Sequence, residues 1–436
     1  MKRKCRHFLL AGFFSWMAQF GFTEDWTQFR GQYGAGVSLD KKLPEKWNNE
    51  DNLQWQVKLP GPGSSSPIVI GERVFVTCYS GYGVPKASGG RLESLERHLV
   101  CVGRSDGKIM WTKTIAGGTP EDSYQGYISE HGYASSTPVT DGERVYCFFG
   151  KSGVVAFDLD GTQLWQINVG KESSNRRWGS AASLILYKNF VIVNASEESR
   201  SIIAIEKETG KQAWKAEGAA LELAYGTPSL ISATDGRVDL VVAVPGEVWG
   251  LNPDTGKIEW YANHQLTGNI SPSIISNEDI VFVFGGFRSA GSLALRVGGK
   301  NDVSKSHVQW SSKNSSYVAT PVFNDGYLYW ISDNGLAFCV AANTGELVYK
   351  ERVPEIKAGN RPVYASPVVA NGKIYVPTRW DGVLVLQAKP VFKILSQNQF
   401  SGDDSDFNAT PSISNNQIFL RSNQFLYCVS EKENRR

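Results

Sequence analysis

Residues 225–260 read YGTPSLISATDGRVDLVVAVPGEVWGLNPDTGKIEW. Three turn signals divide this stretch, Asp235-Gly236, Pro245-Gly246 and Thr255-Gly256, because glycine reaches positive φ at little cost. The segments between the turns are short and largely apolar, which predicts four antiparallel strands. A sheet of this size cannot bury both of its faces, so it must stack on copies of itself.

Copies of the stretch recur along the chain of 436 residues. The Ser/Thr-Pro pair that opens it is found at Ser66-Pro67, Thr137-Pro138, Thr227-Pro228, Ser271-Pro272, Thr320-Pro321, Ser366-Pro367 and Thr410-Pro411. We expect an eighth copy without the proline, in which Ala182 takes the place of Pro228. Counted from positions 67, 138, 182, 228, 272, 321, 367 and 411, the spacings are 71, 44, 46, 44, 49, 46 and 44 residues. Such periods, with four strands each, are typical of β-propeller blades.

The two ends of the chain complement each other. Residues 53–59 resemble the outermost strand of a blade but follow no inner strands, whereas residues 408–430 supply three inner strands and no outer one. We expect residues 53–59 to complete the last blade beside residues 425–430, because ring closure removes an exposed sheet edge. The sequence thus predicts an all-β protein, an eight-bladed β-propeller of four-stranded antiparallel blades.

The fourth strand of most copies carries an aromatic residue at one position. These residues are Trp55, Trp111, Trp165, Trp214, Trp260, Trp310 and, once, Tyr349. A buried tryptophan combines a large apolar body with an N–H group that needs a partner. The regular spacing favours packing between blades over ligand stacking.

The pattern Ala204-x-Glu206-x-x-Thr209-Gly210-Lys211-x-x-Trp214, repeated from Gly250 to Trp260, resembles the tryptophan-docking repeat of PQQ-like propellers. That quinoprotein alcohol dehydrogenase-like superfamily contains PQQ-dependent alcohol and glucose dehydrogenases. It also contains non-catalytic members such as outer-membrane protein assembly lipoproteins. The opening, Trp26 to Gly31 followed by Leu43-Pro44 and Trp47, is similar to that of secreted PQQ-like repeat proteins of no settled activity. The resemblance extends over residues 53–430.

The first residues predict export. Four basic residues precede an apolar run from Phe8 to Phe22, as in a secretory signal. No small-x-small pair precedes Glu24, so an uncleaved anchor is the alternative, and membrane contact is expected only in that case. We divide the chain into a signal or anchor (1–22), a lead-in segment (23–52), the propeller (53–430) and a tail (431–436), and we expect a periplasmic or extracellular protein.

Charge and cysteine content narrow the function classes. Removing residues 1–22 takes away four positive charges and no acid, so the formal net charge changes from +2 to −2, and nucleic acid is not an expected partner. The five remaining cysteines lie in apolar runs, which predicts buried core residues. A disulfide between Cys78 and Cys101 is the alternative. Neither a haem-attachment motif nor a zinc-binding spacing is present.

Two long insertions point to one functional face. Strands alternate in direction, so the connections into each first strand and between each second and third strand emerge on the same side, here called the funnel face. Both insertions, Tyr79–Arg97 and Ala116–Glu130, belong to that face, and long connections on a rigid scaffold often carry function. We expect Tyr79, Tyr82, Tyr124 and Tyr127 to crown its rim.

Residues just before each first strand are expected to line the central funnel on this face. They are His131, Tyr133, Arg177, Trp178, Glu222, Tyr225, Asn269, Tyr317, Arg361, Tyr364, Asp406 and Asn408. Aromatic walls with a few charges suit a protein, a peptide or a small polar or sugar-like ligand. The alternative is that these side chains fill and hydrate a structural channel.

An enzymatic alternative comes from the resemblance alone. In the dehydrogenases, the resemblance implies a Glu and an Asn that bind calcium, an Asp that acts as the base, an Arg near the quinone and a pair of adjacent cysteines. Glu222, Asn269, Asp406 and Arg361 supply the residue types, but the sequence has no Cys-Cys pair. We therefore predict a monomeric binding or protein-interaction scaffold without catalytic residues, metal or firm cofactor. The alternative is a PQQ- and calcium-dependent oxidoreductase acting on alcohols or sugars.

Overall fold

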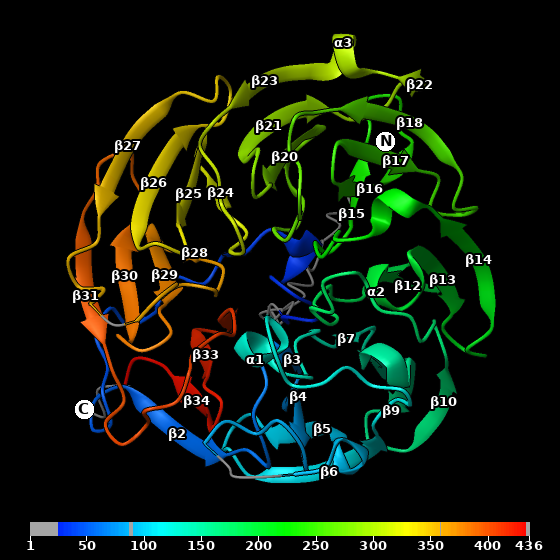
Figure 1. Ribbon diagram of the computed structural model, residues 1–436. Coiled ribbons are helices and arrows are strands. Elements are labelled where there is room, and N and C mark those ends of the chain that lie inside the picture. The colour runs from blue at the N-terminus through cyan, green and yellow to red at the C-terminus, as the bar shows by residue number, and fades with distance from the viewer. Residues whose placement is uncertain (1–24, 87–89, 358, 433–436) are drawn as a thin grey trace, which may run out of the picture.

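The computed structural model describes residues 25–86, 90–357 and 359–432, so the predicted signal segment, residues 1–22, and most of the predicted tail lie outside the described residues. Eight four-stranded antiparallel units surround a central channel (Figure 1). The predicted all-β, eight-bladed propeller is confirmed. Within each of the first seven blades the strands run from the channel outward in chain order, whereas the outermost strand of the eighth comes from the beginning of the chain.

The first four blades follow one another around the ring in chain order. Blade 1 consists of β3 (Ile68–Ile70), β4 (Arg73–Ser80), β5 (Glu96–Gly103) and β6 (Ile109–Ala116). Blade 2 consists of β7 (Val139–Thr140), β8 (Arg144–Phe148), β9 (Val154–Asp158) and β10 (Gln163–Ile167). Blade 3 consists of β11 (Ile185–Tyr187), β12 (Phe190–Ala195), β13 (Ser201–Glu206) and β14 (Gln212–Glu217). Blade 4 consists of β15 (Ser229–Ser232), β16 (Val238–Val244), β17 (Glu247–Leu251) and β18 (Ile258–Asn263), with β22 (Asn301–Asp302) added in parallel to β18.

The remaining blades complete the ring. Blade 5 consists of β19 (Ile275–Asn277), β20 (Ile280–Gly285), β21 (Gly291–Arg296) and β23 (Val308–Ser312). Blade 6 consists of β24 (Val322–Asn324), β25 (Tyr327–Ile331), β26 (Leu336–Ala341) and β27 (Leu347–Arg352). Blade 7 consists of β28 (Val368–Ala370), β29 (Lys373–Pro377), β30 (Val383–Gln387) and β31 (Ile394–Asn398), with β1 (Val37–Ser38) added in parallel to β28. Blade 8 consists of β32 (Ser412–Ser414), β33 (Gln417–Arg421), β34 (Phe425–Val429) and β2 (Leu53–Lys58).

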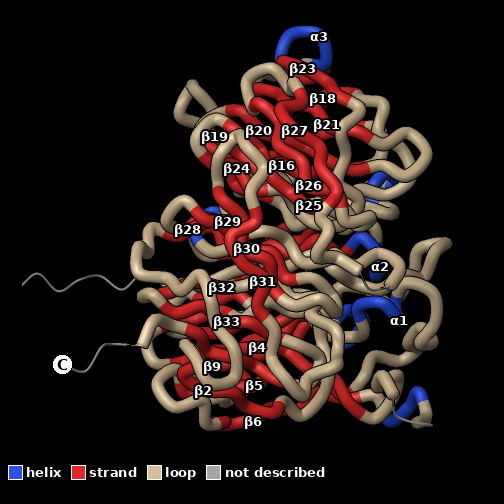
Figure 2. Tube along the Cα trace, turned by 90° about the vertical axis from the view of Figure 1, so that its left-hand side faces the viewer, coloured by secondary structure: helices blue, strands red, loops and turns tan. Residues whose placement is uncertain are grey.

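Helices are short and lie in the connections. They are α1 (Ile128–His131), α2 (Ser196–Ser199) and α3 (Ser304–His307), with 3-10 turns η1 (Gln32–Gly34), η2 (Leu92–Ser94), η3 (Gly150–Ser152) and η4 (Ala219–Leu221). Figure 2 shows α1 and α2 on the same side of the propeller. Among the described residues, no helix has the length and apolar character needed to cross a membrane.

The ring closes as the sequence predicted. β2 pairs antiparallel with β34, with Trp55 opposite Cys428 and Val57 opposite Leu426. The backbone N–H of Leu59 also donates to the Gln424 carbonyl at 2.8 Å. The last blade is therefore built from both ends of the chain, and the outer edge of β34 is covered.

The repeated tryptophans pack between blades. The indole N–H of Trp165 donates to the Lys207 carbonyl of the next blade at 2.8 Å, and Trp55, Trp214 and Trp310 make equivalent bonds. The turn glycine of the next blade lies flat on the ring. At Gly210, with φ +70°, a Cβ atom would come 2.7 Å from Trp165. The Thr-Gly turn of one blade and the tryptophan of the preceding blade thus form one joint, and the predicted packing of these tryptophans between blades is confirmed.

The register of two repeats differs from the expected one. Strand β11 begins at Ile185 and β15 at Ser229, so Ser183, rather than Ala181, corresponds to Thr227. Ser273 likewise precedes β19 by two residues, so Pro272 is not equivalent to Pro228. The alignment of Ala182 with Pro228 is therefore wrong. The feature that recurs in every blade is a Ser or Thr residue two positions before the first strand.

The N-terminal segment crosses one end of the channel (Figure 1). Trp26 exchanges two backbone hydrogen bonds with Val69 of blade 1, and β1 pairs with β28 of blade 7. Between them, the fully buried Arg30 donates to the carbonyls of Thr320, Pro321 and Pro367 at 2.8–3.1 Å. Burial lowers the Arg30 pKa to about 9, which leaves the guanidinium charged at neutral pH. The conspicuous Trp26–Gly31 motif is thus a plug.

Candidate functional site

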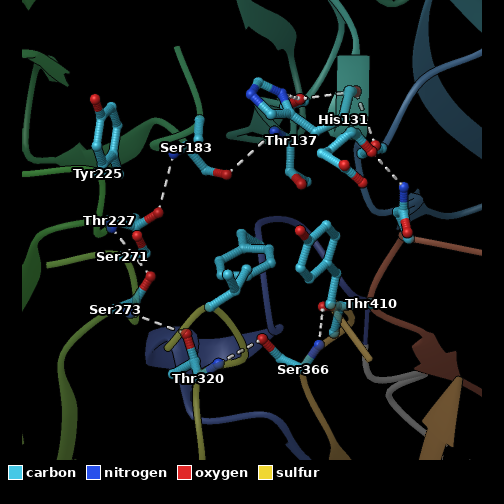
Figure 3. A pocket seen from close by; sticks show the side chains of 18 of the residues that line it. His131, Thr137, Ser183, Tyr225, Thr227, Ser271, Ser273, Thr320, Ser366 and Thr410 are labelled. Carbon is cyan, nitrogen blue, oxygen red and sulfur yellow. Dashed lines mark hydrogen bonds between the residues drawn. The ribbon is translucent and has the colours of Figure 1, made fainter. Parts of the chain in front are cut away.

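A belt of hydroxyl groups surrounds the channel. Its members each precede the first strand of a blade by two residues: Ser66, Thr137, Ser183, Thr227, Ser273, Thr320, Ser366 and Thr410. In seven places the backbone N–H of one member donates to the hydroxyl of the next at 2.9–3.1 Å (Figure 3). The belt is open between Thr410 and Ser66, where the Ser66 hydroxyl has no partner among the described residues. There, Ser412 of blade 8 donates instead to the Pro67 carbonyl.

The belt lines a cavity of about 170 Å³, here called the cup. Phe29 of the plug contributes to its lining, and so do Tyr127 and Glu130 of the long insertion. Trp178 and Tyr225 stack in the wall with ring centroids 5.8 Å apart and an interplanar angle of 29°. The cup therefore combines hydroxyl groups with aromatic faces.

Residues 117–131, here called the lid, belong to the connection between blades 1 and 2 and border the cup. The Tyr127 ring lies 4.2 Å from the Trp178 ring, and its hydroxyl is 3.1 Å from that of Tyr317. The Arg361 guanidinium donates to the Tyr127 hydroxyl and lies 4.9 Å from its ring centroid. One lid residue thus contacts blades 3, 6 and 7.

A second fastening holds the end of the lid. Glu130 accepts from Arg379 at 2.6 Å, and Arg379 in turn donates to Asp406 at 2.6 Å. Asn408 donates to the Glu130 carbonyl at 2.8 Å. Trp380 donates its indole N–H to Asp406 at 2.8 Å. This network ties the lid to blades 7 and 8.

The beginning of the lid rests on buried ion pairs. Arg97 and Glu121 are 2.6 Å apart, and Lys151 and Asp122 are 2.8 Å apart. All four side chains are at most 10% exposed. Breaking a buried pair by removing one partner is strongly destabilising, so these pairs fix the base of the lid on blades 1 and 2.

Two adjacent glutamates of α2 lie behind the cup wall. Glu197 accepts from the Tyr225 hydroxyl at 2.6 Å and from the Ser174 hydroxyl at 2.7 Å. Burial raises the pKa of Glu198 to about 7, while the Ser180 hydroxyl donates to one of its oxygens. The other oxygen has no partner within the described part of the chain.

His131 joins the lid to the segment that precedes blade 3. Its Nε2 lies 2.8 Å from the Trp178 carbonyl, which only accepts, so Nε2 carries the proton. Nδ1 then accepts from the Ser135 hydroxyl at 2.5 Å. Burial lowers the His131 pKa, which favours this neutral form. Both ring nitrogens are engaged in positioning the chain.

The predicted funnel residues separate into two groups. Those that line the cup are His131, Trp178, Tyr225, Asn269, Tyr317, Tyr364 and Asn408. Arg361 and Asp406 instead help to hold the lid in place. Arg177 is exposed. Glu222 lies outside the cup, where it accepts a hydrogen bond from the Asn175 N–H at 2.8 Å. Tyr133 packs edge-on against Tyr79 under the lid, with ring centroids 5.4 Å apart.

One rim expectation is wrong. Tyr79 is 1% exposed, because β4 continues through it and directs its ring into the cluster with Ile128 and Tyr133. Tyr82 and Tyr124 are half-buried around the same cluster, and Tyr127 is the one that turns over the cup. Tyr79 is buried because the side chains of the two insertions pack against one another.

The roles of the belt, Glu130 and Arg379 were not predicted from the sequence. The belt had a visible signal, since a Ser or Thr precedes most of the repeated prolines. Arg379 follows β29 and carried no such periodic signal.

The five cysteines among the described residues are free, and all are buried, as predicted. The register of β4 and β5 pairs Cys78 with His98 and Cys101 with Phe75, so the two thiols are not opposite each other. The alternative disulfide does not form.

The residues that the resemblance suggested for binding calcium and PQQ are not arranged to bind them. Asn269 lines the cup, whereas Glu222 lies in a separate surface depression and both Asp406 oxygens are engaged by Arg379 and Trp380. Over the described residues, no three His, Cys, Asp or Glu side chains are grouped to hold a metal ion. The donor set of the dehydrogenases is therefore not assembled by these positions.

The fold and the tryptophan joints define a PQQ-like β-propeller. The family model described as outer membrane protein assembly factor BamB matches residues 48–220 and 191–300, more than half of the sequence. The chain belongs to this family.

Relatives and solved structures agree with that assignment. The outer membrane protein assembly factor BamB of Moranella endobia (strain PCIT) is 25% identical over 277 residues, which cover 59% of this chain and 65% of that protein, less than two thirds of its length. The Yersinia pestis protein of the same name is 23% identical over 288 residues, 61% of this chain and 67% of that protein.

The solved structures share the fold alone. BamB from Moraxella catarrhalis superposes with a TM-score of 0.61 at 14% identity, covering 88% of this chain and 98% of that one. A europium-containing methanol dehydrogenase gives 0.62 at 12% identity, covering 93% and 98%. The same architecture thus occurs in an assembly factor and in an enzyme.

Proposed function

We propose that this protein is an exported, monomeric scaffold that docks a protein partner on its funnel face during outer membrane protein assembly. The relatives named as assembly factors support the process, and the predicted signal segment supports export. The main support for docking on this face is the contact of the lid with aromatic and arginine side chains from several blades, which together form one surface.

The surface has the composition of a protein-binding site. Phe287 is 61% exposed beside Tyr317, and Arg176 lies 5.9 Å from the Trp178 ring centroid. Aromatic and arginine residues supply most of the binding energy at protein interfaces. Tyr225 takes no part in docking, because it is buried and its hydroxyl is bonded to Glu197.

Site-specific photo-crosslinking tests the proposal. A photoreactive residue at 177 or 287 is expected to capture a protein of the outer membrane assembly machinery in cells. The same residue at Lys305, exposed in α3 at the outer rim, is the control and is expected to capture none. Capture from position 305 but from neither funnel-face position would contradict the proposal, as would a funnel-face partner unrelated to outer membrane assembly.

A further inference from the structure

We propose that the cup binds a small neutral polyhydroxylated molecule, the size of a monosaccharide, at the open point of the hydroxyl belt. This inference does not rest on a protein partner, because the cup lies beneath the lid and the docking positions 177 and 287 do not line it. Its basis is a set of unpaired polar atoms facing an aromatic wall.

Unpaired polar atoms line the cup from the neighbouring blades 8 and 1. Ser66 is 1% exposed and Asn408 is 9% exposed, and both line the cup. Ser66 Oγ and Asn408 Oδ1 have no hydrogen-bond partner among the described residues. The Tyr364 hydroxyl also lines the cup and has no partner among the described residues. Buried polar groups are almost always paired, so three such groups beside one cavity indicate groups that a guest can satisfy. A hydroxyl of the guest can donate to Asn408 and both donate to and accept from Ser66.

The opposite wall offers ring faces. Trp178 and Tyr225 stack there, and Tyr317 lies beyond Tyr127. The negative face of an aromatic ring attracts the slightly positive C–H edge of a saturated ring. A sugar ring has both features, hydroxyls at its periphery and C–H groups on its faces, so the two walls suit its two sides.

Charge and size agree with a neutral guest. The ionisable residues that line the cup are Glu130 and His131. Glu130 is paired with Arg379, and both nitrogens of His131 are engaged, so no free charge is offered to an ion. A cavity of 170 Å³ accommodates on the order of ten water molecules, or a guest of about a dozen non-hydrogen atoms. A hexose has this size.

Binding can be measured with defined sugars. Glucose, galactose, mannose, N-acetylglucosamine and ribose are titrated separately into the whole protein by calorimetry, with saturation-transfer NMR as a second readout. At least one of them is expected to bind with a dissociation constant in the millimolar range or tighter. Ser66→Ala is expected to weaken that binding about tenfold, the effect of roughly one lost buried hydrogen bond.

A matched control separates binding from stability. Ser414 Oγ is also buried and unpaired but lies outside the cup, so Ser414→Ala is expected to leave binding unchanged. Neither hydroxyl makes a hydrogen bond within the described part of the chain, so both melting temperatures should stay near that of the unaltered protein. Trp178→Ala, which removes a stacking face, is expected to abolish measurable binding. The proposal is overturned if no sugar binds, in which case water alone satisfies these groups, or if Ser66→Ala binds as well as Ser414→Ala.

Discussion

A chain that lacks residues 1–60 is expected to aggregate instead of folding to a stable monomer. The deletion removes β2 and uncovers the outer edge of β34, and an unpaired strand edge is a template for association. It also removes Trp55, whose indole N–H joins blade 8 to the Arg104 carbonyl of blade 1 at 2.7 Å. The ring then loses both a strand and an inter-blade joint at its closure.

Two shorter deletions are the controls. Removing residues 1–24 keeps the plug and β2, so this chain should behave as the full one. Removing residues 1–48 keeps β2 but loses Trp26 and Arg30, so it should remain monomeric and melt at a lower temperature. Size-exclusion chromatography and thermal melting by circular dichroism distinguish the three. A monomeric chain without residues 1–60 and with an unchanged melting temperature would refute ring closure by β2.

Trp260→Ala is expected to lower the free energy of unfolding by about 3–5 kcal/mol, as for other large-to-small changes in a core. Trp260 is fully buried, and its cluster joins blade 4 to Val281 and Leu293 of blade 5. Its joint differs from the others. The indole N–H donates to Asp239 of its own blade at 2.6 Å, and Asn301 of β22 pairs beside it. Alanine would leave a cavity and deprive a buried carboxylate of one donor.

Trp260→Phe separates the two contributions. The ring remains, but the bond to Asp239 is lost, so the effect should be smaller, about 1–3 kcal/mol. Urea unfolding curves of the three proteins give the comparison. A change below about 1 kcal/mol for alanine, within the range of surface substitutions, would reject a packing role for Trp260.

The architecture was predictable because its signals are local and repeated. Each Thr-Gly turn requires a positive φ, most of the strand-ending tryptophans donate to a carbonyl of the next blade, and both features recur at a fixed period. The unpaired strand at residues 53–59 predicted the closure by the same logic. Tertiary contacts were needed only to confirm these features.

The site was less predictable because it depends on contacts between distant segments. The sequence placed Tyr127 on a long insertion, but its contact with Arg361 spans 234 positions. Tyr79 and Tyr127 looked alike, and only packing against Ile128 decides that Tyr79 is buried. The register shift at Ser183 escaped notice because proline, not the hydroxyl before it, served as the marker.

Hydrogen exchange of the protein with and without its captured partner tests whether the partner binds to the funnel face. We expect slower exchange in the lid, residues 117–131, and in residues 286–290 around Phe287 when the partner is bound. Turns on the opposite face, at residues 235–237 and 343–346, should exchange at unchanged rates. Slower exchange confined to those turns, with the lid unaffected, would contradict the assignment of the funnel face as the binding surface.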